Sequence, residues 1–289
     1  MFESRGYLLD LTHRVPTERT LQEIVDVLAR CRYTEFRPYA EGDFPSESLD
    51  LKRIGAYCEM QGVEMIPTSR EEFERLFLGK DTICASTEAP RSLAGRVEEM
   101  RERMERAEAM GRGRRRFLVT DFSDGYAWHP LVVSLPGIIL GGAFASGGAK
   151  AARMDLEREL NGVLDAPLGG LVLKLGTLYL RGGAVRDEAS EYFNILAGDH
   201  GYSRHPGITQ AVLDDVSGVV RGVRIAAERW TDRSDWAKEI AYAALLLDCA
   251  CHRRSEPMLR ELRDAHGRIW RMRFAPEGRV ESLARLPRF

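Results

Sequence analysis

Short apolar runs recur through the first part of the chain, each with the length of a buried strand. They cover residues 7–12, 35–40, 63–67, 82–85 and 116–121. Helical spacing separates several of them: Leu21, Ile24 and Leu28 share one face behind a capping box of Thr20 and Glu23. Two further helices are expected at 51–61 and 92–110. Strands alternating with helices at this spacing predict right-handed crossovers and a parallel sheet.

Beyond about residue 150 the strand pattern gives way to helical periodicity. Helices are expected at 154–164, 188–196, 209–230, 235–251 and 257–274. The chain therefore divides into an α/β region, residues 1–150, and a helical C-terminal region, residues 151–289.

One uncharged stretch, residues 131–148, is long enough to raise the question of a membrane span. It contains Pro136 and several glycines, which favour a buried core segment instead. The start of the chain lacks the basic region and long apolar core of a signal peptide. We therefore expect a soluble, cytoplasmic protein without membrane contacts.

Composition narrows the classes of function. The 289 residues include 42 Lys and Arg against 44 Asp and Glu, a net charge of -2. A general nucleic-acid binder normally has a basic excess, so no nucleic-acid partner is expected. Five widely spaced cysteines do not suggest a disulfide framework, in keeping with a reducing compartment.

No motif predicts a cofactor or a metal. The glycine-rich segment 141–148 lacks the Lys and Ser/Thr that end a phosphate loop. His200 and His205 lie near Asp199, but no further ligand completes a site, so a polar loop is the simpler interpretation.

Five blocks carry a family resemblance, in the same order along the chain. They read RGYLLDLT with VPTERTL at 5–21, YAEGDF at 39–44, IPT at 66–68, TDFSDGYAWHPLVVS at 120–134 and WRMRFAPEGRVES at 270–282. Together they resemble bacterial proteins of the β-N-acetylhexosaminidase kind, glycoside hydrolase family 20 and its relatives. The resemblance implies a TIM-type barrel whose last strand lies in the fourth block.

The chain differs from that family in the segment that carries the family's catalytic residues. The third-strand block runs almost directly into what resembles the seventh strand, and the segment with the family's adjacent Asp-Glu pair is missing. In the family that Glu is the general acid, and the Asp orients the acetamido group of the substrate. The dipeptide Asp187-Glu188 precedes a predicted helix, where acidic residues usually interact with the helix dipole.

Residues just beyond the carboxyl ends of barrel strands line one mouth. Carboxylates there can accept hydrogen bonds from sugar hydroxyls, and aromatic rings can pack on the sugar ring. Asp10 and Asp121 have a second interpretation, in which they tie down loops by accepting backbone N–H bonds. The predicted mouth contains Asp10, His13, Arg14, Glu41, Asp43, Thr68, Asp121, Asp124, Tyr126 and Trp128.

Several mouth positions differ from the family. Either His13 or Arg14 stands where the family has an arginine that holds sugar hydroxyls, and Gly42 replaces a histidine. Further changes are Phe122, Ser123 and Ser146. Each change weakens a tight sugar pocket.

The fold hypothesis is an incomplete TIM-type barrel of about five parallel strands in residues 1–150, followed by the helical region. Either the sheet stays open beneath that region, or two chains form a homodimer through their sheet edges.

Three functions stay open. The first is a carbohydrate-recognising relative with reduced or lost hydrolysis, whose ligand is a small sugar such as an N-acetylhexosaminide. The second is an active glycosidase, or another sugar-processing enzyme, in which Glu41 and Asp124 carry the catalysis. The third is a non-catalytic scaffold.

Overall fold

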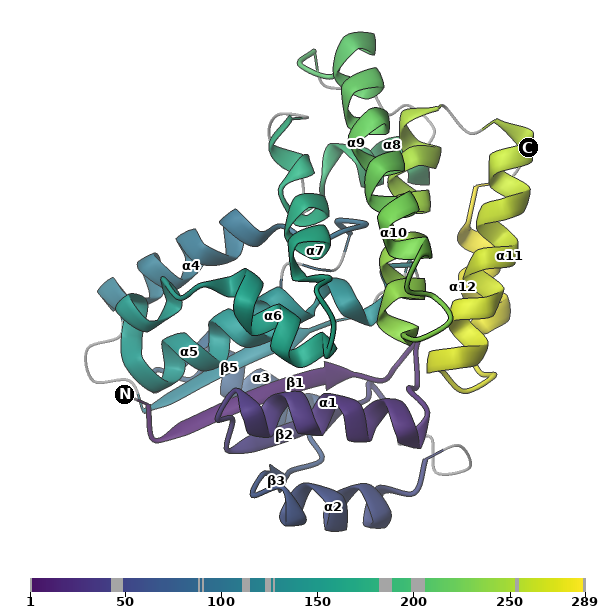
Figure 1. Ribbon diagram of the computed structural model, residues 1–289. Coiled ribbons are helices and arrows are strands. Elements are labelled where there is room, and N and C mark those ends of the chain that lie inside the picture. Colours follow the sequence, from purple (N-terminus) through teal and green to yellow (C-terminus); the bar gives the residue numbers. More distant parts are fainter. Residues whose placement is uncertain are drawn as a thin grey trace.

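The computed structural model describes residues 2–42, 49–87, 89, 91–110, 115–122, 126, 128–181, 189–198, 206–252 and 255–287. Its single parallel sheet has the strand order β3-β2-β1-β5-β4 (Figure 1). The strands are β1 (Ser4–Asp10), β2 (Glu35–Tyr39), β3 (Glu64–Met65), β4 (Thr82–Ser86) and β5 (Arg116–Asp121). The expected α/β class and parallel sheet are confirmed, and the sheet is open, with β3 and β4 at its edges.

Helices connect and cover these strands. The first half contains α1 (Glu18–Arg30), α2 (Leu51–Met60), α3 (Arg70–Leu78), α4 (Val97–Met110) and α5 (Leu135–Ala152). The second half contains α6 (Leu156–Leu164), α7 (Gly169–Gly176), α8 (Glu191–Ala197), α9 (Gln210–Glu228), α10 (Asp235–Cys251), α11 (Glu256–Arg273) and α12 (Arg279–Arg285). Two short 3-10 turns are η1 (Leu131–Val133) and η2 (Leu178–Arg181).

The handedness of the crossovers explains which helix covers which face. The steps β1 to β2, β2 to β3 and β4 to β5 all run in one direction across the sheet. Right-handed crossovers therefore place α1, α2 and α4 on one face, where they share the main core with α5. The step from β3 to β4 runs back across the whole sheet, so its helix, α3, is directed to the opposite face.

The face under α3 has a small core of its own. Phe73 of α3 lies 5.4 Å from Tyr39 and 5.1 Å from Phe122, measured between ring centroids. Leu8 and Leu118 of the central strands complete this cluster. One short helix therefore covers the sheet face that the helical region does not reach.

The start of α1 corrects one sequence prediction. The N-cap is Thr17, whose side chain accepts a hydrogen bond from the N–H of Thr20 at 3.3 Å. Thr20 is buried within the first turn, and Glu23 binds Arg273 of α11. The predicted capping box of Thr20 and Glu23 is therefore wrong by one turn, because Thr17 offers an equivalent hydroxyl at the true helix start.

The uncharged stretch forms η1 and α5. Residues Leu131–Ala152 are long and apolar enough to cross a membrane by length and composition, and 78% of this segment is buried inside the protein. The predicted core segment is thus confirmed as buried. Its glycines permit close packing: a Cβ at Gly142 would lie 2.4 Å from the carbonyl oxygen of Cys31.

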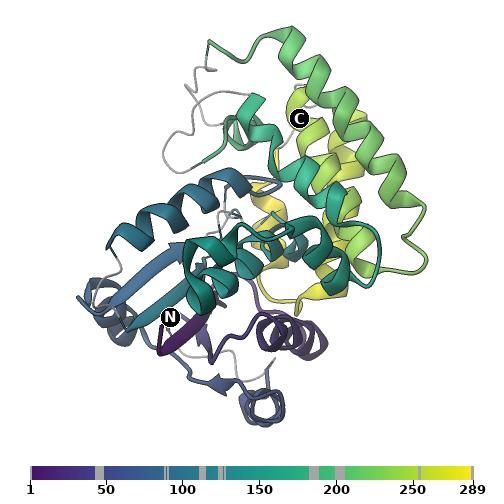
Figure 2. The same cartoon turned by 60° about the vertical axis from the view of Figure 1, so that its left-hand side comes forward.

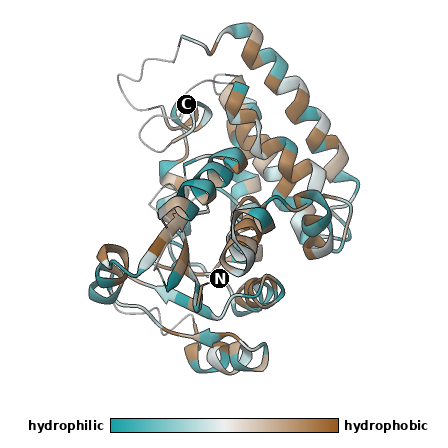
Figure 3. Ribbon diagram, turned by 90° about the vertical axis from the view of Figure 1, so that its left-hand side faces the viewer, coloured by the Kyte–Doolittle hydropathy of each residue, from teal (hydrophilic) through white to brown (hydrophobic). Residues whose placement is uncertain are grey.

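The helical half packs beside the end of the sheet (Figures 1 and 2). Its helices alternate hydrophobic and hydrophilic residues, as helices with one buried side do (Figure 3). Buried residues of both halves form one continuous core. The predicted boundary after residue 150 falls within α5.

A buried ion-pair network also joins the halves. Arg273 of α11 binds both Glu239 of α10 and Glu23 of α1, and its guanidinium lies 4.2 Å from the ring centre of Trp236. Glu239 also accepts the backbone N–H of Val132 at 2.8 Å. These contacts hold the helical half against the end of the sheet.

Candidate functional site

The carboxyl ends of β1 and β5 lie side by side, but their two aspartates face different ways. The strand register pairs Leu9 with Asp121, so these two side chains share the face of the main core. Asp10, one residue further on, belongs to the face of Leu8 beneath α3. The sequence placed both carboxylates at one mouth, whereas the alternation of side chains along a strand separates them.

Asp10 has a local role in the structure. Its Oδ1 accepts a hydrogen bond from the N–H of Thr12 at 2.9 Å, which shapes the turn leaving β1. The side chain of Thr12 in turn accepts the N–H of Glu41 at 3.1 Å. This geometry is the loop-stabilising arrangement considered for Asp10 from the sequence.

Asp121 lies in a closed cluster with Tyr7, Arg14 and His129. The Tyr7 hydroxyl donates to Oδ2 at 3.0 Å, and Nε2 of His129 lies 3.8 Å from Oδ1. Arg14 donates to the carbonyl of His129 at 2.6 Å and contacts Nε2 of its ring at 3.1 Å. Asp121 and Arg14 are only 1% and 2% exposed, so this charged pair is sealed from solvent.

The electrostatics of this cluster keep Asp121 ionised. Burial alone would raise the pKa of its carboxyl, but the imidazole of His129 and the guanidinium of Arg14 hold that pKa below its ordinary value. Burial lowers the pKa of Arg14, while Asp121 and Tyr7 oppose that shift. An ionised, enclosed carboxylate can orient neighbours but cannot protonate a glycosidic oxygen.

Glu41 and His13 are the accessible charged or titratable members of the predicted set among the described residues. The side chain of Glu41 is 58% exposed and pairs with Arg70 of α3 at 3.1 Å. His13 is 33% exposed and lies 3.8 Å from Glu281 of α12. Both are open to a ligand approaching the end of the sheet.

The aromatic candidates differ in accessibility. Trp128 is 1% exposed and packs 5.3 Å from Tyr126 and 5.5 Å from Phe193, while its Nε1 donates to the carbonyl of Ser282 at 3.4 Å. Helices α8 and α12 thus contribute contacts to the tryptophan expected to bind a sugar. Tyr126 is half-buried, and Arg285 lies 5.3 Å from its ring centre.

Several predicted positions fall outside the described residues. They are Asp43, Ser123, Asp124, the Asp187-Glu188 dipeptide, Asp199, His200 and His205. Thr68, three residues beyond β3, is buried and accepts a hydrogen bond from Arg37 at 3.4 Å. The catalytic hypothesis for Asp124 accordingly stays a prediction.

The sequence interpretation missed the partners that enclose the site. His129 and Tyr7 lie inside blocks that were recognised, yet neither was a candidate. Glu239 and Arg273 come from the helical half, and both are at most 1% exposed. The sequence did contain a sign of them, because each is a charged residue on the apolar side of a helix. A charged side chain in such a position requires a buried partner.

Glu239, the described carboxyl group whose pKa is raised, has no access to a substrate. Burial raises the pKa of Glu239, and Arg273 and the Val132 N–H oppose that shift. Its side chain is 0% exposed and bound to Arg273, so it cannot reach a sugar. Within the described part of the chain, the accessible groups can bind hydroxyls, and the buried groups hold the fold.

No family model matches this chain, and no curated protein was found to be similar to it. The arrangement at the end of the sheet is therefore the basis for a functional proposal.

Proposed function

We propose that this protein is a carbohydrate-recognising relative of β-N-acetylhexosaminidases that has lost glycoside hydrolysis. The observation that carries the proposal is the strand order. In a (β/α)8 barrel, consecutive strands are neighbours and the last strand returns beside the first. Leaving out the strands between the third and the seventh gives the order β3-β2-β1-β5-β4, with β5 as the returning strand.

The position of the resemblance agrees with this interpretation. The block that resembles the last barrel strand begins at Thr120, in β5, directly beside the first block in β1. In place of the omitted strands, α3 covers the face that would line the barrel interior. A sheet shortened in this way retains the carboxyl-end loops of the first, second and last strands.

The same shortening supports the loss of hydrolysis. Substrate-assisted hydrolysis needs a protonated carboxyl group to donate to the glycosidic oxygen and a second carboxylate to orient the acetamido group. The family's Asp-Glu segment is missing, Asp121 is held ionised, and Asp10 is engaged in a turn. Recognition needs only hydroxyl partners, which the accessible rim of Glu41, His13 and Tyr126 supplies.

Titration with N-acetylglucosamine, followed by two-dimensional NMR, tests this proposal. Glu41→Gln should raise the Kd of the sugar about fivefold to tenfold, because one charge-assisted hydrogen bond is lost. Glu74→Gln is the matched control, since Glu74 also pairs with Arg70 at 3.1 Å but lies along α3. Its Kd should stay that of the unchanged protein.

Two outcomes would replace the proposal. Turnover of a chromogenic N-acetylglucosaminide that disappears in Glu41→Gln or Asp124→Asn would establish the active glycosidase. The scaffold hypothesis is favoured by the burial of Arg14, Asp121 and Trp128. Failure of N-acetylglucosamine, glucose and galactose to cause saturable shifts at millimolar concentration would overturn sugar recognition and favour the scaffold.

A further inference from the structure

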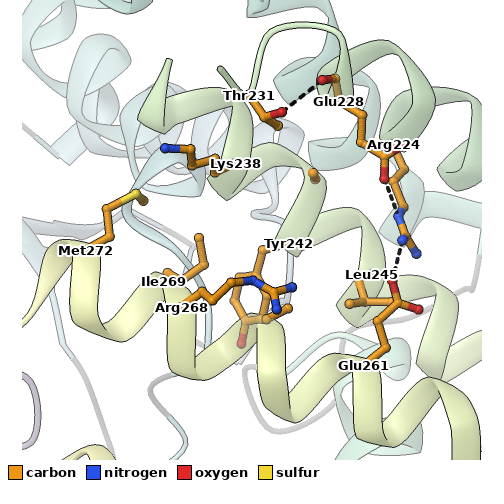
Figure 4. A pocket seen from close by; sticks show the side chains of 12 residues that line it. Arg224, Glu228, Thr231, Lys238, Tyr242, Leu245, Glu261, Arg268, Ile269 and Met272 are labelled. Atoms are coloured by element: carbon orange, nitrogen blue, oxygen red, sulfur yellow. Dashed lines mark hydrogen bonds and ion pairs between the residues drawn. The ribbon is translucent and has the colours of Figure 1, made fainter. Parts of the chain in front are cut away.

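A cleft in the helical half lies between α9, α10 and α11 (Figure 4). Its volume is about 470 Å³, within the range of about 300–1,000 Å³ that small-ligand pockets occupy. None of its lining residues belongs to the predicted sugar site. They are Arg224, Glu228, Thr231, Lys238, Ala241, Tyr242, Leu245, Glu261, Ala265, Arg268, Ile269 and Met272.

The cleft follows from how three helices pack. Both α9 and α11 pack against α10, which forms the base between them. Ala241 and Ala265 are small residues at positions where larger side chains would fill the gap. The apolar lining comes from Leu245, Ile269 and Met272, so a ligand here would bury hydrophobic surface.

Tyr242 adds an aromatic wall to this lining. Its hydroxyl bonds to Nδ1 of His266 at 2.7 Å, inside the protein. That hydroxyl is therefore already engaged, and the ring itself is what Tyr242 contributes to the cleft (Figure 4). The Tyr242 ring therefore favours an apolar ligand group, and its hydroxyl is not offered to the ligand as a hydrogen-bond partner.

The charged side chains at the cleft differ in whether they already have an ion-pair partner. Arg224 binds both Glu228, at 2.9 Å, and Glu261, so these two carboxylates share one cation. Lys238 pairs with Asp235 at 2.8 Å. Arg268 is exposed and has no hydrogen-bond or ion-pair partner among the described residues. A guanidinium with free donors beside an apolar wall is suited to a carboxylate.

We propose that this cleft binds a small amphipathic carboxylate. The carboxylate pairs with Arg268, and the apolar body packs on Tyr242, Leu245 and Ile269. Glu228 and Glu261 repel a second negative charge, which selects a monoanion. The ligand class is thus a single carboxylate on a medium-length acyl chain or on an aromatic ring. This proposal does not depend on carbohydrate recognition at the sheet.

Isothermal titration calorimetry with decanoate and with 2-naphthoate tests the proposal. The comparison shows whether the apolar part of the ligand is an acyl chain or an aromatic ring. Saturable binding of either anion at a concentration below about 1 mM is expected, and the tighter one identifies the apolar body. Arg268→Gln should raise its Kd about tenfold. Arg271→Gln is the matched control, because Arg271 is an exposed arginine of the same helix outside the cleft lining.

Further ligands and variants distinguish recognition of the carboxylate charge from nonspecific hydrophobic binding. Decan-1-ol should bind equally to the unchanged protein and to Arg268→Gln, and amide shifts should centre on α10 and α11. Ala241→Leu should abolish binding of the anions while circular dichroism shows an unchanged fold. The proposal is overturned if neither anion binds by 1 mM, or if decyltrimethylammonium binds as tightly as decanoate.

Discussion

At the residue scale, Asp121 is a buried carboxylate whose partners come from separate parts of the chain. Tyr7 lies on β1, Arg14 in the loop after it, and His129 in the segment before α5. A buried charge without its partner costs far more than the pair contributes, so each group depends on the others. The cluster therefore fixes the geometry at the carboxyl end of the sheet.

Asp121→Asn is expected to lower the free energy of unfolding by about 3 kcal/mol, because the buried Arg14 guanidinium loses the largest of the opposing charges around it. Chemical denaturation measures this loss. Tyr7→Phe removes only one hydrogen bond to the same carboxylate and should cost about 1 kcal/mol. Equal, small effects of both changes would mean that the charge of Asp121 is not a structural requirement.

His266 predicts a pH dependence of stability. Burial lowers the pKa of its imidazole to about 3, and the ring is bonded to Tyr242 and Ser282. In the unfolded chain a histidine binds a proton below about pH 6.5. The unfolded state therefore holds more protons between about pH 6.5 and 3, and stability falls as the pH falls through that window.

Denaturation midpoints measured between about pH 7 and 4 should show this loss, with a slope of up to about 1.4 kcal/mol per pH unit. His266→Gln should remove most of the slope while keeping an amide able to bond both partners. An identical slope in the unchanged protein and in His266→Gln would show that His266 does not titrate in this way.

At the element scale, α3 decides how the second face of the sheet is covered. No helix was expected between the third and fourth strands, although Ser69 and Glu72 have the spacing of a capping box. In the structure Ser69 accepts the N–H of Glu72 at 3.2 Å. The helix was missed because it is short and charged, and few apolar residues mark its buried side.

Phe73→Ala should lower the free energy of unfolding by about 2 kcal/mol, because it empties the cluster beneath α3. Phe77→Ala is the comparison on the same helix, since Phe77 is 57% exposed, and it should cost less than about 0.5 kcal/mol. Thermal unfolding of the two variants measures the difference. Equal effects would show that α3 does not stabilise this face.

The helices and strands show which features of the fold could be predicted from the sequence. Apolar periodicity located all five strands and the parallel sheet, because buried strands need continuous apolar runs. It could not show that Asp10 and Asp121 face opposite sides, since that depends on the register between two strands. Nor could it place Arg273 beside Glu239, because such pairing is decided by tertiary packing.

At the scale of the whole molecule, β3 and β4 are the edge strands of the sheet, with no further strand paired to them among the described residues. The N–H of Thr87, one residue beyond β4, donates to the carbonyl of Thr120, and the carbonyl of Ala85 accepts from the Thr120 hydroxyl, so the peptide groups of Ala85 and Thr87 face β5. The peptide groups of Cys84 therefore point to the open edge. Near this edge, Phe77 and Leu78 are 57% and 79% exposed at the end of α3.

A homodimer through β4 is the prediction that follows from this edge. Light scattering at about 50 μM protein should give twice the mass of one chain. Cys84→Pro should give a monomer, because proline removes an outward N–H without removing a hydrogen bond to β5. A monomeric unchanged protein at about 100 μM would contradict the dimer.

We propose sugar recognition without hydrolysis at the carboxyl end of a sheet that derives from a shortened barrel. Saturation-transfer NMR with p-nitrophenyl N-acetyl-β-glucosaminide tests it most directly, since one sample reports both binding and cleavage. We predict magnetisation transfer to the sugar protons and an unchanged glycoside spectrum over several hours at about pH 4 to 8. Release of p-nitrophenol would contradict the loss of hydrolysis, and absence of magnetisation transfer to the sugar at every pH would contradict sugar recognition.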